Sequence, residues 1–381
     1  NYLFYFLNIS HSFLKNKVDW CYKDYGLLWS YNLNYFDWLS QENMSLKTGL
    51  KSLSIFYKSV HNNSVGIDPY PTSIRIVNIA KFVVKWNIKK SWLYDEILMD
   101  LKMLKKRLEY HLLANHLLEN AFALYIGGIV TNKTIYIESG RNLIREQLHE
   151  QILKDGMHYE RSPMYHCIIL EKLLDSLNFA QANNDNFKTF LDHYAAKMVA
   201  YALNWLNLDR LPMMQDSVYD VAIPLNKLLM YSKSLLADSY PNSPCLMSNS
   251  GYRIIRNKNF RIIFNIGSIG PNYQPGHSHA DELNFEFFHY GKPIIVDKGV
   301  STYEKNSIRL LERSTKSHNC LTIDELNSSD VWSGFRVGNR AKVIIEHDKT
   351  KTKAYHNGFS GSKVSREILS GESSMSIIDN V

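Results

Sequence analysis

Apolar residues recur at helical spacing from about residue 36 to about residue 240. The segment over residues 73–86 carries a broad apolar face and begins with Ser73, a residue type that caps helices. Segments with the same spacing lie at residues 112–129, 141–153, 164–180 and 189–206. Short polar linkers separate them, and no strict repeat indicates a TPR-like or HEAT-like array. We therefore expect antiparallel helix pairs in a bundle, solenoid or closed toroid.

The pattern changes after about Ser250 to short β-like runs, separated by glycine, asparagine and serine. These runs lie at residues 260–267, 283–290, 292–297 and 340–347. Several short strands of this kind predict an antiparallel sandwich. With the change of pattern near residues 241–245, we expect an α-helical domain over residues 1–245 and a β-sandwich domain over residues 246–381.

The length of the chain indicates its number of domains, and its net charge indicates the kind of partner it binds. A chain of 381 residues is too long for one ordinary core, which favours two domains. The net charge of +7 favours an acidic partner, such as a polyanionic polysaccharide, a nucleic acid or an anionic membrane surface. No basic run has the spacing of a nucleic-acid motif, and no apolar run is long enough for a membrane span. Much of the high aromatic content must lie in the core, but aromatic clefts also suit sugar rings, which keeps an acidic polysaccharide among the expected partners.

Cysteines and chain ends add little. The four cysteines are scattered without a CxxC motif, so no disulfide framework is expected and the compartment is not decided. The first residue is Asn1, no signal peptide is visible, and the last residues are strand-like. Both ends look cut, so we expect an incomplete sandwich. The Lys-, Asn- and Ile-rich composition indicates a bacterial origin.

The candidate chemistry centres on His277 and His279, in a loop that we expect to run into a strand. Residues i and i+2 of a strand share a face, so both rings are expected to point into one site. Asp297 and His318 follow at the edges of β-like segments. Two histidines and a carboxylate at strand ends fit a metal site, and histidine is also the usual acid or base near neutral pH.

Four segments together resemble the heparinase II/III-like polysaccharide lyases. They are residues 115–120 (Asn-His-Leu-Leu-Glu-Asn), 155–166 (Asp-Gly-Met-His-Tyr-Glu-Arg-Ser-Pro-Met-Tyr-His), 274–281 (Gln-Pro-Gly-His-Ser-His-Ala-Asp) and 313–319 (Arg-Ser-Thr-Lys-Ser-His-Asn). Residues 29–37 also resemble the start of that family's sequences, so the similarity spans nearly the whole chain. It implies an α+β multidomain fold, an incomplete (α/α) toroid followed by an antiparallel β-sandwich, in agreement with the two periodicities.

The reaction of that family is β-elimination at a uronic acid. It needs a group that neutralises the carboxylate, a base for the C5 proton and an acid for the leaving oxygen. The resemblance makes Tyr165 base, acid or both, and places His277 beside it as the catalytic histidine. Because an unperturbed tyrosine has a pKa near 10, a tyrosine base needs a cationic neighbour. Arg161, four residues earlier, is expected on the same helix face.

The resemblance assigns further roles. Asn115 or His116, with Glu119 nearby, is expected to neutralise the substrate carboxylate, and the sequence does not choose between them. Arg161 and Arg313 are expected to bind substrate. Three residues match the ligands of one divalent metal ion, with Zn²⁺ expected and a structural role favoured over a catalytic one: His279, Asp297 and His318.

Weaker candidates remain around this set. Glu160, His166 and Asp216 are expected to line or brace the site, and Trp332 either stacks on a sugar or packs in a core. The polymer is open among glycosaminoglycan, capsule, exopolysaccharide and alginate-like uronates. Two alternative functions also stay open: a metal-dependent polysaccharide hydrolase or esterase, and a non-catalytic polysaccharide-binding protein of an exopolysaccharide or capsule pathway. A periplasmic or secreted location is expected.

Overall fold

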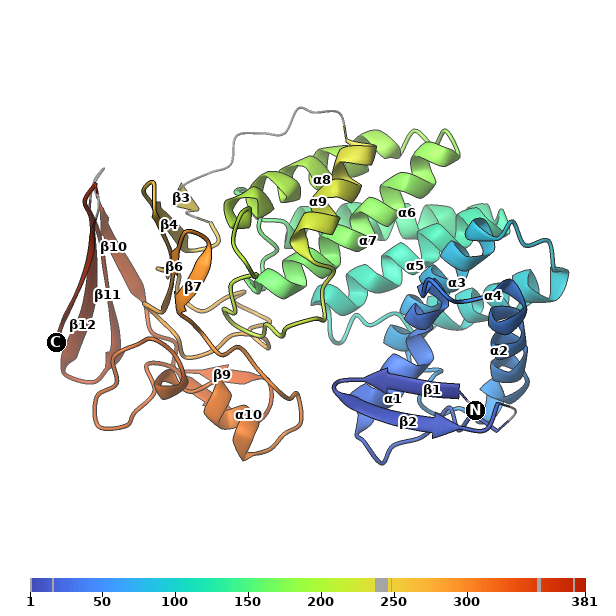
Figure 1. Cartoon of the computed structure of the whole chain (residues 1–381), viewed down its shortest axis with the longest axis horizontal. Coiled ribbons are helices and arrows are strands. Elements are labelled where there is room, and N and C mark those ends of the chain that lie inside the picture. The colour runs from blue at the N-terminus through green and yellow to red at the C-terminus, as the bar shows by residue number, and fades with distance from the viewer. Residues whose placement is uncertain (1, 16, 237–245, 248, 348–350, 373) are drawn as a thin grey trace. The chain divides into compact units, whose positions relative to one another are not determined.

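The computed structural model describes residues 2–15, 17–236, 246–247, 249–347, 351–372 and 374–381, and it is helical first and β-rich second (Figure 1). The chain divides into two compact units, Asn1–Leu148 and His149–Val381. The predicted domain boundary at residues 245/246 adjoins residues 237–245, which lie outside the described residues, so it stays a prediction.

The first unit begins with a β-hairpin that the sequence patterns did not predict. Its strands β1 and β2 are antiparallel, and the ring of Phe4 packs 5.5 Å from that of Trp38. The helices that follow are α1 (Leu27–Tyr35), α2 (Leu46–Ser59), α3 (Pro69–Lys85), α4 (Ser91–Lys105), α5 (Ala114–Thr131) and α6 (Thr134–Gln151), after β1 (Tyr2–Phe6) and β2 (Ile9–Phe13). Helix α6 ends just inside the second unit.

Helix α3 starts earlier than predicted. Its N-cap residue is Asp68 and Pro69 is the first helical residue, so Ser73 lies inside the helix instead of capping it. Proline suits this first position because its fixed φ is helical and the N–H that it lacks would have no helical partner. Helices α3 and α4 both pack against α5, which is buried along most of its length.

The helices of the second unit are α7 (Pro163–Ala182), α8 (Lys188–Ala202) and α9 (Leu225–Leu235), followed later by the short α10 (Ser307–Glu312). Helix α7 packs against α8 and α9, and Figure 1 shows the three side by side. Its residues from Ile169 to Leu177 are almost entirely buried. None of the described helices of the chain is both long and apolar enough to span a bilayer.

Two antiparallel sheets follow α9. The first has the order β3-β4-β5-β6-β7, the second is the meander β10-β11-β12-β13, and β8 and β9 form a separate hairpin. The strands are β3 (Leu246–Met247), β4 (Tyr252–Arg256), β5 (Phe260–Asn265), β6 (Phe285–His289), β7 (Lys292–Ile295), β8 (Asp330–Trp332), β9 (Arg336–Gly338), β10 (Val343–His347), β11 (Lys351–Phe359), β12 (Ser362–Ser370) and β13 (Met375–Asn380).

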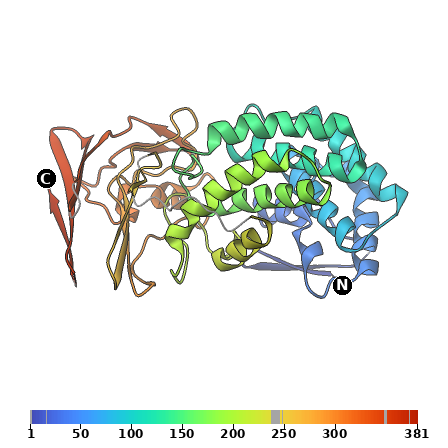
Figure 2. The ribbon, with the colours of Figure 1, turned by 90° about the horizontal axis from the view of Figure 1, so that it is seen from above.

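The two larger sheets stack face to face as the predicted sandwich (Figure 2). One apolar cluster joins them, with Phe264 and Phe285 from the first sheet and Ala354, Val364 and Ile368 from the second. Inward-facing residues of both sheets form such a core when strands alternate between buried and exposed positions. The four predicted strands correspond to β5, β6, β7 and β10, each shorter than predicted.

Candidate active site

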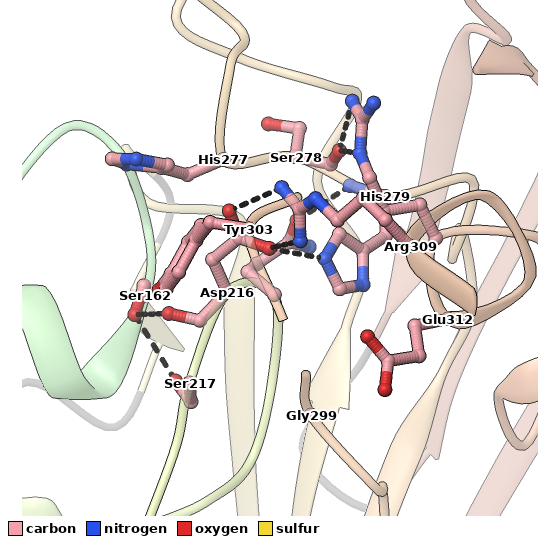
Figure 3. Close-up of polar contacts among 12 residues, drawn as sticks. Ser162, Asp216, Ser217, His277, Ser278, His279, Gly299, Tyr303, Arg309 and Glu312 are labelled. Carbon is pink, nitrogen blue, oxygen red and sulfur yellow. Dashed lines mark hydrogen bonds and ion pairs between the residues drawn. The ribbon is translucent and has the colours of Figure 1, made fainter. Parts of the chain in front are cut away.

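Tyr165 lies in the first turn of α7, where the local sequence fixes its place. Ser162 is the N-cap residue, and its hydroxyl accepts a hydrogen bond from the Tyr165 backbone N–H at 3.3 Å. The same hydroxyl donates to the backbone carbonyl of Asp216 at 2.7 Å, which attaches this helix start to the loop over residues 213–217 (Figure 3). Capping and a proline at the first position make this helix start rigid.

His277 lies directly against Tyr165, as the sequence predicted. The two rings are parallel within 9°, and their centroids are 4.2 Å apart. On another side, the Tyr165 hydroxyl lies 3.3 Å from the hydroxyl of Tyr303. Sequence reasoning missed Tyr303, whose only signal is its position a few residues after Asp297. Two phenols and one imidazole therefore form a compact set of proton-transfer groups.

The predicted strand geometry of the two histidines is wrong, because residues 277–279 form a loop before β6. The backbone therefore does not impose the alternation of a strand. His277 turns to Tyr165, whereas His279 turns to Asp216, which its Nε2 meets at 2.8 Å. Figure 3 shows the two rings extending from the loop in different directions. They belong to two distinct clusters.

The protonation states of the pair differ. Burial raises the pKa of Tyr165 well above its ordinary value, and Tyr303 and Asp216 raise it further. Burial lowers the pKa of His277, but the Glu160 carboxylate, with Oε1 2.9 Å from Nδ1, more than offsets this and the net pKa is raised. At neutral pH Tyr165 therefore holds its proton and is suited to donate it, while His277 is the more basic group.

Glu160 is buried between two histidines. Its Oε1 contacts His277, and its Oε2 lies 3.6 Å from Nδ1 of His158. Burial lowers the pKa of His158 to about 4, so that ring stays neutral. The single negative charge of Glu160 therefore acts mainly on His277, which is a more specific role than the predicted bracing.

Arg161 does not lie where the helical spacing placed it. Helix α7 begins only at Pro163, and Arg161 has a left-handed φ of 62°, so it is not one turn before Tyr165 on a helix face. Its guanidinium donates to the backbone carbonyl of Ser268 and lies against Gly267 and Gly270, where an added Cβ would come within 3.0 Å of it. Arg161 fastens this loop, and no described contact joins it to Tyr165.

Arg313 is also a brace in this structure. It is fully buried, and its guanidinium donates to the backbone carbonyl of Ser278 at 3.1 and 2.9 Å. Burial lowers its pKa to about 10. A guanidinium already bound to carbonyls has no open face for a substrate carboxylate, so the predicted substrate contact does not match this position. It instead holds the loop that carries His277.

The predicted carboxylate-binding residues belong to the first unit. Asn115, His116 and Glu119 all lie at the start of α5. His116 contacts Glu109, with Nδ1 3.0 Å from Oε1, and its ring stacks on Tyr70 at 4.4 Å.

The acidic neighbour of His116 is therefore Glu109, because Glu119 faces the interior and is fully buried. Glu109 itself accepts a hydrogen bond from the Asn120 side chain at 2.8 Å. The His116 side chain is 32% exposed and can meet a ligand, whereas Asn115 is buried. The choice between the two residues stays open.

The three predicted metal ligands lie in one buried cluster. His279 Nδ1 is 3.2 Å from His318 Nε2, and His318 Nδ1 is 2.8 Å from an Asp297 carboxylate oxygen. Burial lowers the pKa of His279 to about 4, while Asp297 more than offsets the effect of burial on His318 and raises its pKa. The described contacts thus form a hydrogen-bonded row from Asp297 through both rings to Asp216.

Two of the three predicted ligands fit a metal ion. A spacing of 3.2 Å between two imidazole nitrogens suits a shared zinc ion, whose Zn–N bonds are about 2.0–2.1 Å. Asp297 does not fit, because it binds the His318 nitrogen that points away from His279. Within the described residues, no group of three or more His, Cys, Asp or Glu side chains is arranged to hold a metal ion.

Comparisons with known proteins agree with this architecture. The family model for the heparinase II/III N-terminus matches residues 72–245, and the model described as heparinase II/III-like, C-terminal, matches residues 241–381. A heparin-sulfate lyase of Bacteroides thetaiotaomicron is 26% identical over 260 residues, 56% of this chain and 37% of that protein. A heparin-sulfate lyase of Pedobacter heparinus is 23% identical over 219 residues, 50% of this chain and 32% of that protein.

Solved structures show the same fold. A heparinase III structure aligns with a TM-score of 0.70 at 17% identity and covers 95% of this chain and 65% of its own. The heparan sulfate lyase HepC from Pedobacter heparinus aligns with a TM-score of 0.62 at 17% identity, over 97% of this chain and 65% of its own. These likenesses confirm the predicted toroid and β-sandwich class. The chain spans about a third of the length of the curated relatives.

Proposed function

This chain belongs to the heparinase II/III-like family, and on that premise we propose that it is a polysaccharide lyase acting by β-elimination on a uronic-acid-containing polysaccharide. The observation that carries the proposal is the contact of Tyr165 with His277 and Tyr303. Its two curated relatives are heparin-sulfate lyases, which favours a glycosaminoglycan over a capsule, exopolysaccharide or alginate-like polymer.

The charge states support a division of labour between the two central residues. Tyr165, whose pKa is raised, donates its proton to the O4 oxygen as the C4–O bond breaks. His277, which Glu160 makes more basic, takes the C5 proton. The reaction also needs a group that neutralises the uronate carboxylate, so that negative charge can build up as C5 loses its proton, and the family resemblance assigns this role to Asn115 or His116. The products are a fragment with a new reducing end and a fragment whose non-reducing end is an unsaturated uronate with a C4=C5 double bond.

The product distinguishes this function from its alternatives. A lyase produces a double bond conjugated with the carboxylate, which absorbs in the ultraviolet, whereas a hydrolase or esterase gives products without that absorption. We would incubate the protein with heparan sulfate, heparin, alginate and hyaluronan and follow ultraviolet absorbance. Tyr165→Phe is the test variant, and Tyr290→Phe, which alters a largely exposed tyrosine, is the matched control.

A rise in absorbance that only the Tyr165→Phe change abolishes is the expected result. New reducing ends without absorbance would replace the proposal with hydrolysis, and binding without any product would replace it with a polysaccharide-binding role.

We propose, separately, that His279 and His318 hold one structural divalent ion, with Zn²⁺ the expected species. The 3.2 Å spacing of their facing nitrogens supports this, and Asp297 joins only if its carboxylate moves from the far nitrogen of His318. Elemental analysis of the purified protein and of His318→Ala tests it. One bound metal ion per chain, lost in the variant, is expected; a metal-free protein with normal stability would refute it.

A periplasmic or secreted location is a further proposal, because polymeric substrates of this size lie outside the cytoplasm. Fractionation of the source cells tests it, and recovery of the protein in the cytoplasmic fraction would refute it.

A further inference from the structure

The β8–β9 hairpin carries exposed aromatic and basic side chains that the chemistry above does not use. Trp332 is 56% exposed and Phe335 is 37% exposed. An indole this exposed is not a core residue, which leaves sugar stacking as the surviving sequence-based interpretation of Trp332. Trp332 pairs directly with Arg336 across the hairpin, so both side chains leave the same face.

The hairpin turn borders the proton-transfer groups. The ring of Phe335 is parallel within 8° to that of Tyr303, with centroids 6.2 Å apart, and lies 6.3 Å from the ring of His277. Lys305 lies along the same turn, since a Cβ added at Gly334 would come within 3.1 Å of its Cγ. Trp332 and Arg336 therefore lie within a few residues of a side chain that contacts the reacting groups.

Two buried arginines hold the hairpin in place. Arg309 Nε donates to the Gly334 carbonyl at 3.0 Å, and Arg313 donates to the carbonyls of Ser333 and Arg336 at 3.4 and 3.3 Å. Arg313 also binds the Ser278 carbonyl, next to His277. The turn and the histidine loop are thereby joined through one side chain. A site that is ordered before binding loses less conformational entropy when the ligand arrives.

We propose that the β8–β9 hairpin is a sugar-binding subsite adjoining the reaction centre. The Trp332 indole stacks on the pyranose ring next to the uronate that is cleaved, and Arg336, with Lys305 nearby, binds an anionic group of that sugar. The guanidinium fork matches the paired oxygens of carboxylate or sulfate, and the net charge of +7 suits a polyanion. This assignment rests on the proposed lyase function, and the occupant is an acidic sugar of the same polysaccharide molecule that is cleaved.

Binding without turnover is the direct test. In a Tyr165→Phe background, we would titrate heparan sulfate oligosaccharides calorimetrically into protein carrying Trp332→Ala, Trp332→Phe or Arg336→Gln. Trp86→Ala, at a partly exposed tryptophan on the first unit, and Lys258→Gln, at an exposed cation between β4 and β5, are the matched controls. Circular dichroism and melting temperature confirm that each variant folds.

Trp332→Ala and Arg336→Gln should each weaken binding roughly tenfold, as removal of anchoring Trp and Arg residues does elsewhere. Trp332→Phe should keep most of the affinity, and the controls should not change it. With Tyr165 intact, the two sensitive variants should raise KM and leave kcat unchanged. Comparing N-desulfated with fully sulfated oligosaccharides then shows whether Arg336 binds a carboxylate or a sulfate group.

Two results separate the subsite from the lyase. If the protein cleaves heparan sulfate but Trp332→Ala and Arg336→Gln bind like the controls, the subsite is wrong and the lyase stands. If no polymer yields the unsaturated product but the two variants still bind more weakly than the controls, the subsite stands without the lyase. Absence of binding by every variant and by the parent protein refutes the subsite.

Discussion

The second unit should lose unfolding free energy as the pH falls from about 7.5 to about 5. Replacing His166 with glutamine should make that loss about 2 kcal/mol smaller. His166 is fully buried in α7, its Nε2 lies 3.1 Å from the Met198 carbonyl, and its Nδ1 accepts from the His158 backbone N–H. Burial lowers its pKa to about 3, and the neighbouring His158 lowers it as well. A proton on Nδ1 would face an N–H donor and lose that hydrogen bond.

The magnitude follows from proton linkage. In the unfolded chain this histidine has its ordinary pKa of 6.5, so it binds a proton as the pH falls while the folded state does not. Between about pH 7.5 and about pH 5, this difference in proton binding lowers the free energy of unfolding by about 2 kcal/mol, which corresponds to about 1.5 pKa units. The stability is present above the unfolded pKa and is lost as the pH falls toward the folded pKa.

The assay compares urea unfolding at the two pH values for the parent protein and for His166→Gln, followed by circular dichroism. Glutamine keeps a donor and an acceptor but cannot be protonated, so it should lose about 2 kcal/mol less stability between the two pH values. His193→Gln, at a solvent-exposed position of α8, is the matched control. An unchanged pH dependence in His166→Gln would show that His166 does not stay neutral in the folded protein.

Three further outcomes are expected at the site. Tyr165→Phe should lower kcat on polymer by about 10²–10⁴-fold but keep elimination from a uronate with fluoride at C4, because fluoride needs no acid to leave; equal loss on both substrates would contradict the acid role. Glu160→Gln should lower kcat with little change in KM, because Glu160 touches His277, 2.9 Å away, and unchanged kinetics would refute that influence. Asp216→Asn should lower the free energy of unfolding in urea by about 3–5 kcal/mol, because it leaves the buried Arg309 charge unpaired. The double variant Asp216→Asn, Arg309→Met should recover part of that loss. If the losses of the two single changes simply add in the double variant, the pairing is contradicted.

The order of elements was predictable because burial imposes a period on the sequence. Helix α7 is buried over most of its length and strands β5 and β6 over most of theirs, so apolar residues are concentrated in these segments. The N-terminal hairpin was missed because its outer face is also apolar, with Leu3 71% and Tyr5 63% exposed, which hides the alternation of a strand. Ser73 was wrongly predicted as the cap because the prediction relied on apolar spacing alone. Asp68 and Pro69, a capping residue followed by a proline, mark the earlier helix start.

The site was predictable only where a motif carried it. The contact of Tyr165 with His277 followed from matched segments far apart in the chain, and the structure has it. Tyr303 and Glu109 stand in no motif, and a contact between distant residues leaves no trace in a single sequence. Arg161 was misjudged for a local reason: one left-handed residue before the cap takes it off the helix, and arginine gives no hint of a positive φ.

Asp216 explains how separate loops bring the reacting groups together. Its backbone carbonyl accepts from Ser162 at the start of α7, its backbone N–H donates to the carbonyl of His277, and its carboxylate binds both His279 and Arg309 (Figure 3). A buried ion pair adds little net stability over apolar residues of similar volume, so stability alone does not account for it. Four segments that meet at one residue have few alternative arrangements, and the placement of the Tyr165 helix against the His277 loop depends on that residue. Asp216→Asn keeps the two backbone contacts but weakens those of the carboxylate with His279 and Arg309, so it should disturb the chemistry by loosening the histidine loop and α10 around the retained backbone contacts.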